Sequence, residues 1–92
     1  MRIRYDPAKN ERNMMERGLS FEQVREFEFE TAVIRINEHM DFLEAIYVAL
    51  GFLQGRLHVL CFVEEPDGIC VISFRKAHSR EVNRYAKVQP AD

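Results

Sequence analysis

The chain opens with two hydrophobic patterns of different period. Charged and apolar positions alternate over residues 2–5, which predicts a short strand with its apolar side chains on one face. Asp6 followed by Pro7 is typical of a helix start, because an aspartate caps free N–H groups and a proline fits the first turn. Gly18 suits the position after a last helical turn. Together these signals predict a helix over residues 7–17.

A second helix is expected directly afterwards. Ser20 and Gln23 are spaced as in a capping box, in which two side chains satisfy backbone N–H groups at a helix start. Phe21, Val24 and Phe27 then give this helix one apolar stripe. Two helices therefore precede the main run of strands.

From residue 32 the pattern changes to runs rich in β-branched and aromatic residues. The expected strands cover residues 32–36, 44–53, 56–64 and 69–74. Gln54-Gly55 and the segment 65–68 are turn signals, and turns this short join antiparallel neighbours. A last helix is expected from residue 77 or 78 to about residue 87, followed by a frayed tail.

The order of these elements predicts the fold class. Helices come first and last, so they pack on the sheet and do not form crossovers between parallel strands. We therefore expect an α+β fold, with an antiparallel sheet, two N-terminal helices and one C-terminal helix. The 92 residues are expected to form one domain, 1–92, and 47% hydrophobic residues can build a core. No apolar run approaches the roughly 18 residues of a membrane span. The N-terminus also lacks the apolar stretch of a signal peptide, so a cytoplasmic protein without a membrane segment is expected.

The two cysteines are expected to be reduced. If residues 65–68 form a hairpin loop, Cys61 and Cys70 lie diagonally on one face of the sheet and not opposite each other. Two buried thiols in a cytosolic protein are then favoured over a disulfide.

Charge is distributed unevenly along the chain. The net charge of −2 does not point to nucleic-acid binding. However, residues 22–44 contain seven acids and two bases, whereas residues 75–87 contain five bases and one acid. A local basic patch can bind phosphates even on an acidic protein. The alternative is that these charges only solvate the last helix.

The basic cluster begins where a strand ends and a helix starts. Arg75 and Lys76 follow the last apolar run, and Arg80 and Arg84 belong to the helix. Cations and free backbone N–H groups that converge at a helix start can hold a phosphate. Strand alternation points Arg75 and Lys76 to opposite faces, and Arg75 is favoured because its planar fork grips a phosphate with two bonds. Its alternative role is an ion pair with the acidic segment 22–30.

Several short motifs resemble those of a known family. They are Tyr5-Asp6-Pro7-Ala8-Lys9, then Asn13, then Gly18-Leu19-Ser20-Phe21-Glu22, and finally Ile72-Ser73-Phe74-Arg75-Lys76-Ala77 with Glu81 and Tyr85. In this order and spacing they resemble the BrnT toxins of bacterial type II toxin–antitoxin systems, over nearly the whole chain. Asn13 has an alternative role, a structural tie between the first helix and a neighbouring loop.

The resemblance implies a fold, an activity and a partner. It implies a RelE-like fold and a ribonuclease that inhibits translation. It also implies a BrnA-type antitoxin with a ribbon-helix-helix part, through which operator DNA is read, so the toxin itself need not be basic. The rival interpretation is a non-catalytic interaction module with the same fold and the same kind of partner. One departure favours the rival, because relatives usually carry an arginine at the position of Ile46.

Cleaving RNA without a metal needs a group that exchanges protons and positive charge beside the phosphate. Arg75 and Lys76 are candidates for the charge, and Glu81 is a candidate general base. Glu81 could instead cap the last helix by accepting a bond from the backbone N–H of His78. His78 itself is of a residue type that exchanges protons near neutral pH. Tyr85 could stack on a base or pack its ring on the sheet.

The remaining expectations concern RNA contacts and metals. The expected RNA-binding residues are Arg80, Arg84, Tyr85 and His78. No metal and no cofactor are expected, because no spacing among histidines, cysteines and carboxylates suggests a ligand set. His39 falls in a polar loop, and His58 falls in an apolar strand.

Overall fold

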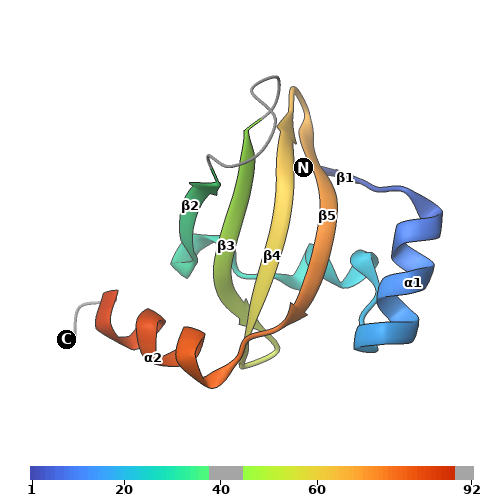
Figure 1. The fold of residues 1–92 in the computed structure, drawn as a ribbon. Helices are drawn as coiled ribbons and strands as arrows, with labels where there is room; N and C mark the ends of the chain where they lie inside the picture. Colours follow the sequence, from blue (N-terminus) through green and yellow to red (C-terminus); the bar gives the residue numbers. More distant parts are fainter. Residues whose placement is uncertain (38–44, 89–92) are drawn as a thin grey trace.

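The computed structural model describes residues 1–37 and 45–88, which form a five-stranded sheet with helical segments on both faces (Figure 1). The strands are β1 (Arg2–Arg4), β2 (Val33–Asn37), β3 (Ile46–Leu53), β4 (Arg56–Glu65) and β5 (Gly68–Lys76). The helical segments are α1 (Pro7–Arg17), the 3₁₀ segments η1 (Phe21–Glu26) and η2 (Phe29–Thr31), and α2 (Ser79–Val88). The expected α+β class is confirmed. None of the described helices is long and apolar enough to span a membrane.

The sheet is mixed and not wholly antiparallel. Its order is β1-β5-β4-β3-β2, and the three pairs from β5 to β2 are antiparallel as expected. β1, however, pairs in parallel with β5, with Arg2 beside Gly68. No short turn joins these two strands, so the rule that sets hairpin direction does not apply to them. The backbone of Arg2 lies so close over Gly68 that a side chain at that position would collide with it.

α1 begins and ends where the sequence predicted. The Asp6 carboxylate accepts a bond from the Ala8 N–H at 2.9 Å, and Pro7 occupies the first turn. At the other end Gly18 adopts a left-handed φ of 70°, which suits glycine, and its N–H reaches the Met14 carbonyl at 2.9 Å. The chain can therefore turn sharply towards the sheet after α1.

The second N-terminal helix was wrongly predicted as an α-helix. Its capping box is present, with the Ser20 N–H bonded to Gln23 Oε1 at 3.0 Å, but the segment is a 3₁₀ helix that breaks at Phe27. The apolar residues of this segment, Phe21, Val24 and Phe27, recur at intervals of three. A 3₁₀ helix has three residues per turn, so in this form all three side chains face the sheet.

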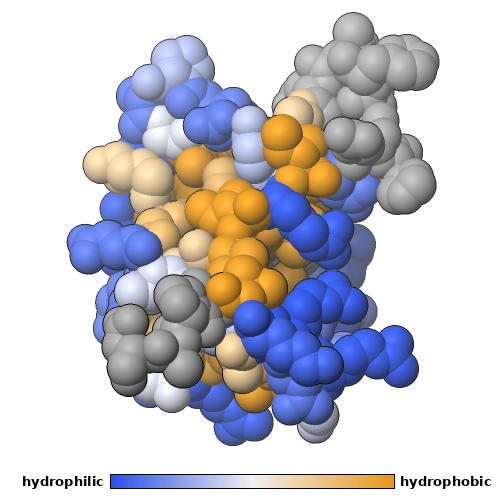
Figure 2. Space-filling view, turned by 90° about the vertical axis from the view of Figure 1, so that its left-hand side faces the viewer, coloured by the Kyte–Doolittle hydropathy of each residue, from blue (hydrophilic) through white to orange (hydrophobic). Residues whose placement is uncertain are grey.

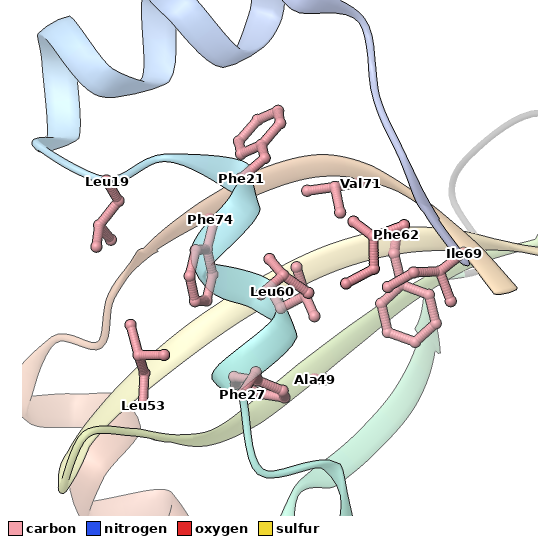
Figure 3. Packing of buried hydrophobic residues seen from close by; sticks show 12 residues of the cluster. Leu19, Phe21, Phe27, Ala49, Leu53, Leu60, Phe62, Ile69, Val71 and Phe74 are labelled. Atoms are coloured by element: carbon pink, nitrogen blue, oxygen red, sulfur yellow. The ribbon is translucent and has the colours of Figure 1, made fainter. Parts of the chain in front are cut away.

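These three residues pack against one face of the sheet, which we call the core face (Figure 3). Its largest fully buried side chains are Phe21, Val24, Leu60, Val71 and Phe74. The rings of Phe27 and Phe74 meet edge to face with centroids 6.0 Å apart. A Cβ at Gly51 would lie 2.7 Å from the Phe27 ring, so β3 depends on a glycine where the 3₁₀ segment crosses it.

The opposite face, which we call the open face, is covered by α2 at only one end (Figure 1). α2 has no fully buried residue. The apolar open-face side chains that remain partly exposed include Ile46, Val48, Val63 and the two cysteines. Cys61 pairs with Ser73 and Cys70 pairs with Val63, so the predicted diagonal placement is confirmed. Both thiols are free, but they are half-buried and not buried, because no described element covers this part of the face.

Candidate functional site

The end of β5 and the first turns of α2 form an open cleft of about 580 Å³. Its lining consists of His78, Ser79, Arg80, Glu81 and Arg84. Two arginines and a histidine thus surround a single carboxylate at the start of a helix. Arg75 contacts this group through its ion pair with that carboxylate, Glu81.

Arg75 points to the open face, where acceptor atoms of two residues, Glu81 and Lys76, hold its guanidinium. Its two terminal nitrogens bond the two oxygens of Glu81 at 2.8 Å each, and one of them also reaches the Lys76 carbonyl at 3.2 Å. The predicted alternative, a structural ion pair of Arg75, is therefore confirmed. Its partner, however, is Glu81 and not an acid of the segment 22–30. The acidic segment 22–30 includes η1, which packs on the core face, whereas Arg75 leaves from the other face.

This arrangement leaves part of the Arg75 fork available. A guanidinium has five N–H donors, and the bonds to Glu81 and Lys76 use three of them. The Arg75 side chain is 26% exposed, so solvent reaches it beside the cleft, although it is not among the residues that line the cleft. Arg75 can therefore contact an anion while Glu81 holds it in place.

Glu81 joins the strand end to the helix start. Besides Arg75, it accepts a bond from the backbone N–H of His78 at 2.8 Å, as expected for a residue that caps a helix. The hydrogen bonds from Arg75 hold the pKa of the Glu81 carboxyl at about 2, well below its usual range. Burial acts in the opposite direction but is outweighed. Glu81 therefore stays ionised at neutral pH and is a weak proton acceptor.

We expect this pair to stabilise the fold in a pH-dependent way. A carboxyl whose pKa is lowered by folding contributes its full stabilisation above its unfolded pKa, and this contribution is lost as the pH falls towards 2. Glu81→Gln should lower the free energy of unfolding by about 1–2 kcal/mol at pH 7, as expected for a lost charged hydrogen bond. This difference should shrink between about pH 5 and pH 2. Urea unfolding followed by circular dichroism at several pH values measures it.

A matched control is Glu11→Gln, an exposed carboxylate on α1 for which the described residues show no ion pair. Its effect on unfolding should be small at every pH. A Glu81→Gln difference that stays constant from pH 7 to pH 2 would contradict the ionic pair.

The structure does not bring Lys76 into the cleft. Lys76 pairs with His58 in the sheet, and Arg75 pairs with Val59, so the two cations leave β5 on opposite faces as predicted. Lys76 is exposed, and it is absent from the residues that line the cleft. Only its carbonyl, which accepts a bond from Arg75, faces the site.

The other predicted residues on α2 divide into two groups. His78, Arg80 and Arg84 are exposed and line the cleft, and no ion pair to Arg80 or Arg84 occurs among the described residues. His78 Nδ1 lies 3.8 Å from Glu81 Oε1. Tyr85 instead packs its ring edge to face on Phe52, with centroids 5.3 Å apart.

Tyr85 also anchors the helix. Its hydroxyl donates a bond to the Thr31 carbonyl at 2.8 Å, which joins α2 to the segment before β2. The packing alternative for Tyr85 is therefore the arrangement observed. Because the same ring borders a groove behind the cleft, Tyr85 fixes the distance between α2 and the sheet.

That groove, of about 60 Å³, runs between α2 and the open face. The sheet contributes Val33, Arg35, Val48, Leu50 and Val59, and α2 contributes Glu81, Arg84, Tyr85 and Val88. Arg35 was missed in the sequence analysis. The alternation of residues 33–37 would have found it, since an arginine between two isoleucines must point away from them.

Ile46, the position where an arginine was expected, is the first residue of β3. Its side chain shares the open face with Arg75. It lies four residues along β3 from Leu50, which is level with Arg75 across the sheet. At about 3.4 Å per residue, the two positions are roughly 14 Å apart along the strands. The departure therefore alters the same face as the cleft but not the cleft itself.

Asn13 is a structural residue in this arrangement. Its amide nitrogen donates to the carbonyls of Leu19 and Phe74 at 2.9 Å each, and its oxygen accepts from the Phe74 N–H at 3.5 Å. The predicted tie to a neighbouring loop is confirmed by the bond to Leu19. Because Phe74 directly precedes Arg75, Asn13 also fixes the strand from which Arg75 leaves.

The described residues offer no ligand set for a metal ion. Within residues 1–37 and 45–88, no group of three histidines, cysteines or carboxylates could hold a metal ion. His58 is 3% exposed, and burial lowers its pKa, so it is a neutral core residue. His39 lies outside the described residues.

Most of the chain matches one known protein family. Residues 5–81 match a family model described as ribonuclease toxin, BrnT, of type II toxin-antitoxin system. No curated protein matches the chain. The matched residues include Arg75, His78 and Glu81, whereas Arg84 and Tyr85 lie beyond the end of the match.

Proposed function

Because the chain belongs to the BrnT family of ribonuclease toxins of type II toxin–antitoxin systems, we propose that it is an endoribonuclease that needs no metal and stops translation. We further propose a RelE-like fold in one domain, 1–92, that acts in the cytoplasm. Its inhibitor would be a BrnA-type antitoxin with a ribbon-helix-helix part, and this part would read the operator DNA. The toxin's own net charge of −2 is compatible with this arrangement, because the antitoxin and not the toxin would contact the DNA.

One observation supports the proposal. Arg75, which lies beside the cations of α2, keeps part of its guanidinium available for a ligand. Two of its N–H donors remain for a phosphate, and Arg75 is bonded to Glu81, which lines the cleft together with Arg80 and Arg84. Cleavage of RNA places growing negative charge on the phosphate oxygens, and fixed donors stabilise that charge without a metal. Lys76 enters this proposal only through its carbonyl, which helps to orient Arg75.

The reaction needs one proton to leave and one to arrive. The 2′-oxygen bonds to phosphorus as its proton passes to a base, and the bond from phosphorus to the 5′-oxygen breaks as that oxygen takes up a proton. We propose His78 for proton exchange, because it is exposed in the cleft and close to Glu81. We propose Glu81 as a positioning residue, since its low pKa makes it a weak base. A general-base role for Glu81 is the alternative.

A non-catalytic module that only binds an antitoxin is the second candidate function. Ile46 favours it, because an apolar side chain there removes a cation from the open face. The partly exposed apolar residues around Ile46 also suit a protein partner better than an RNA backbone. The same interaction would operate in both candidates, and only cleavage separates them.

The proposed function predicts growth arrest. Inducing this chain alone in a bacterium should stop growth and lower the incorporation of labelled amino acids within one doubling. Co-expression of the antitoxin should restore growth. Normal growth with abundant soluble protein would instead support the non-catalytic module.

The same protein should cleave RNA in vitro, and cleavage should persist in excess chelator because positive charge is supplied by arginines. Arg75→Ala protein, purified in parallel and expected to cleave at least tenfold more slowly, controls for contaminating nucleases. Activity lost on chelation and restored by a divalent ion would contradict the proposed chemistry.

A further inference from the structure

The two edges of the sheet differ in a way that points to a partner. β1, at one edge, has only three residues, and the arginines at its two ends form ion pairs with Asp67 and Glu65. Short, charged edge strands resist pairing with other chains. β2, at the other edge, has five residues, and its one charged residue, Arg35, forms no ion pair among the described residues.

β2 exposes apolar side chains next to the outer edge of the sheet. Ile34 is 45% exposed and Ile36 is 51% exposed, and both lie on the core-face side, where they pair with Ala49 and Tyr47. Viewed from this edge, apolar residues gather across the middle of the molecule (Figure 2). They continue the margin of the core, since Tyr47 packs against the core cluster. An additional strand beside β2 would bury both isoleucines.

The centre of β2 carries a positive charge on the opposite side. Arg35 lies between the two isoleucines and points to the open face, where it lines the groove together with Arg84. The edge therefore presents an alternation of apolar, basic and apolar positions. Residues directly opposite each other on neighbouring strands share a face. A complementary strand then needs an acidic residue opposite Arg35 and apolar residues opposite Ile34 and Ile36.

We propose that β2 is the docking edge for an extended segment of the antitoxin with the pattern apolar–acidic–apolar, which adds a sixth strand to the sheet. This inference rests on the proposed function, because the family supplies the antitoxin as partner. Strand addition provides main-chain bonds along the edge, and the alternating side chains provide specificity.

A second copy of this chain fits the edge less well. Two-fold pairing of β2 with itself is antiparallel, and Arg35 is the middle residue of Val33–Asn37. The two copies of Arg35 would then lie directly opposite each other, with Arg84 of each copy nearby. Like charges in that position are unfavourable. The arginine thus disfavours self-pairing and favours an acidic partner.

The proposal also connects docking to inhibition. A strand on β2 would place its acidic residue beside Arg84, which lines both the groove and the cleft. The bound antitoxin would then compete with RNA for a cation of the cleft without filling the cleft.

The test uses this chain and the proposed BrnA-type antitoxin, with affinities from titration calorimetry. Ile34→Lys together with Ile36→Lys should weaken binding by about 100-fold, as expected for two central apolar contacts. Arg35→Glu should weaken it by about tenfold, and an acidic-to-arginine change in the antitoxin should restore it. The control Met15→Lys alters an exposed residue of α1 and should change affinity less than about threefold.

Hydrogen exchange gives a second readout that does not depend on the variants. Amides of residues 33–37 should exchange more slowly in the complex than in free toxin, and cleavage by free Ile34→Lys/Ile36→Lys toxin should match wild type. If the antitoxin inhibits wild-type toxin but leaves β2 unprotected and binds the variants normally, the docking edge is wrong and the toxin function stands. Dimerisation of free toxin through β2 would also overturn the inference. Absence of both growth arrest and antitoxin binding would overturn the proposed function itself.

Discussion

Arg75→Ala is expected to reduce RNA cleavage at least tenfold. The alanine removes the two N–H donors that remain free for a phosphate beside Glu81. A hydrogen bond to a charged group contributes about 1.5–3 kcal/mol, which corresponds to a loss of roughly 10- to 150-fold. Single-turnover cleavage of a short RNA at saturating enzyme measures the chemical step. If the loss persists at saturation, the missing contact acts in the transition state and not only in binding.

Two companion variants make this result interpretable. Lys76→Ala changes the neighbouring cation on the other face and should cost far less than Arg75→Ala. Arg75→Ala also leaves Glu81 without its ionic partner, so part of the loss could come from instability. The double variant Arg75→Ala/Glu81→Gln removes the ionic pair but keeps an acceptor for the His78 N–H, so it should regain thermal stability without regaining activity. A purified Arg75→Ala protein that is well folded and cleaves at the wild-type rate would remove Arg75 from the site.

Asn13→Ala is expected to destabilise the protein by about 2–4 kcal/mol, because an unsatisfied buried polar group costs about 1–3 kcal/mol. The substitution leaves two buried carbonyls, of Leu19 and Phe74, without their donor. For a domain of this size, the expected fall in melting temperature is roughly 10–25 °C. Chemical unfolding gives the free energy directly, and calorimetry gives the melting temperature.

The control for this prediction is Asn83→Ala, an exposed asparagine on α2. Its effect should stay within about 0.5 kcal/mol, as is usual for surface substitutions. Equal stabilities of the two alanine variants would contradict a structural role for Asn13. Wild-type stability of Asn13→Ala with a loss of cleavage would point instead to a direct role in the reaction.

Local signals in the sequence predicted local structure well. Asp6, Pro7 and Gly18 bound α1 because each acts on groups within one helical turn. The hairpin between β4 and β5 follows from its turn residues in the same way. The parallel pairing of β1 could not be read this way, because it joins segments more than 60 residues apart. The 3₁₀ form of η1 was missed because its capping box also starts an α-helix.

The sequence predicted which residues belong to the site but not which of them contact each other. Segment 75–85 was identified, yet the partner of Arg75 was sought among the acids of residues 22–30. The alternation of side chains along β5 excludes those acids as partners, since Arg75 and η1 lie on opposite sides of the sheet. Glu81 serves Arg75 and the helix cap together, so the two predicted roles for this residue were not exclusive. Arg35 enters the groove only through sheet pairing, which no single segment reveals.

The pairing of β1 with β5 has a consequence for biosynthesis. β1 is synthesised before β5 and must wait for it before it can join the sheet. Arg75 lies near the end of β5 and α2 follows that strand, so a nascent chain cannot assemble the cleft before both elements are made. Long-range pairings of this kind also fold slowly. The order of synthesis thus delays the completed cleft until β5 and α2 have both left the ribosome.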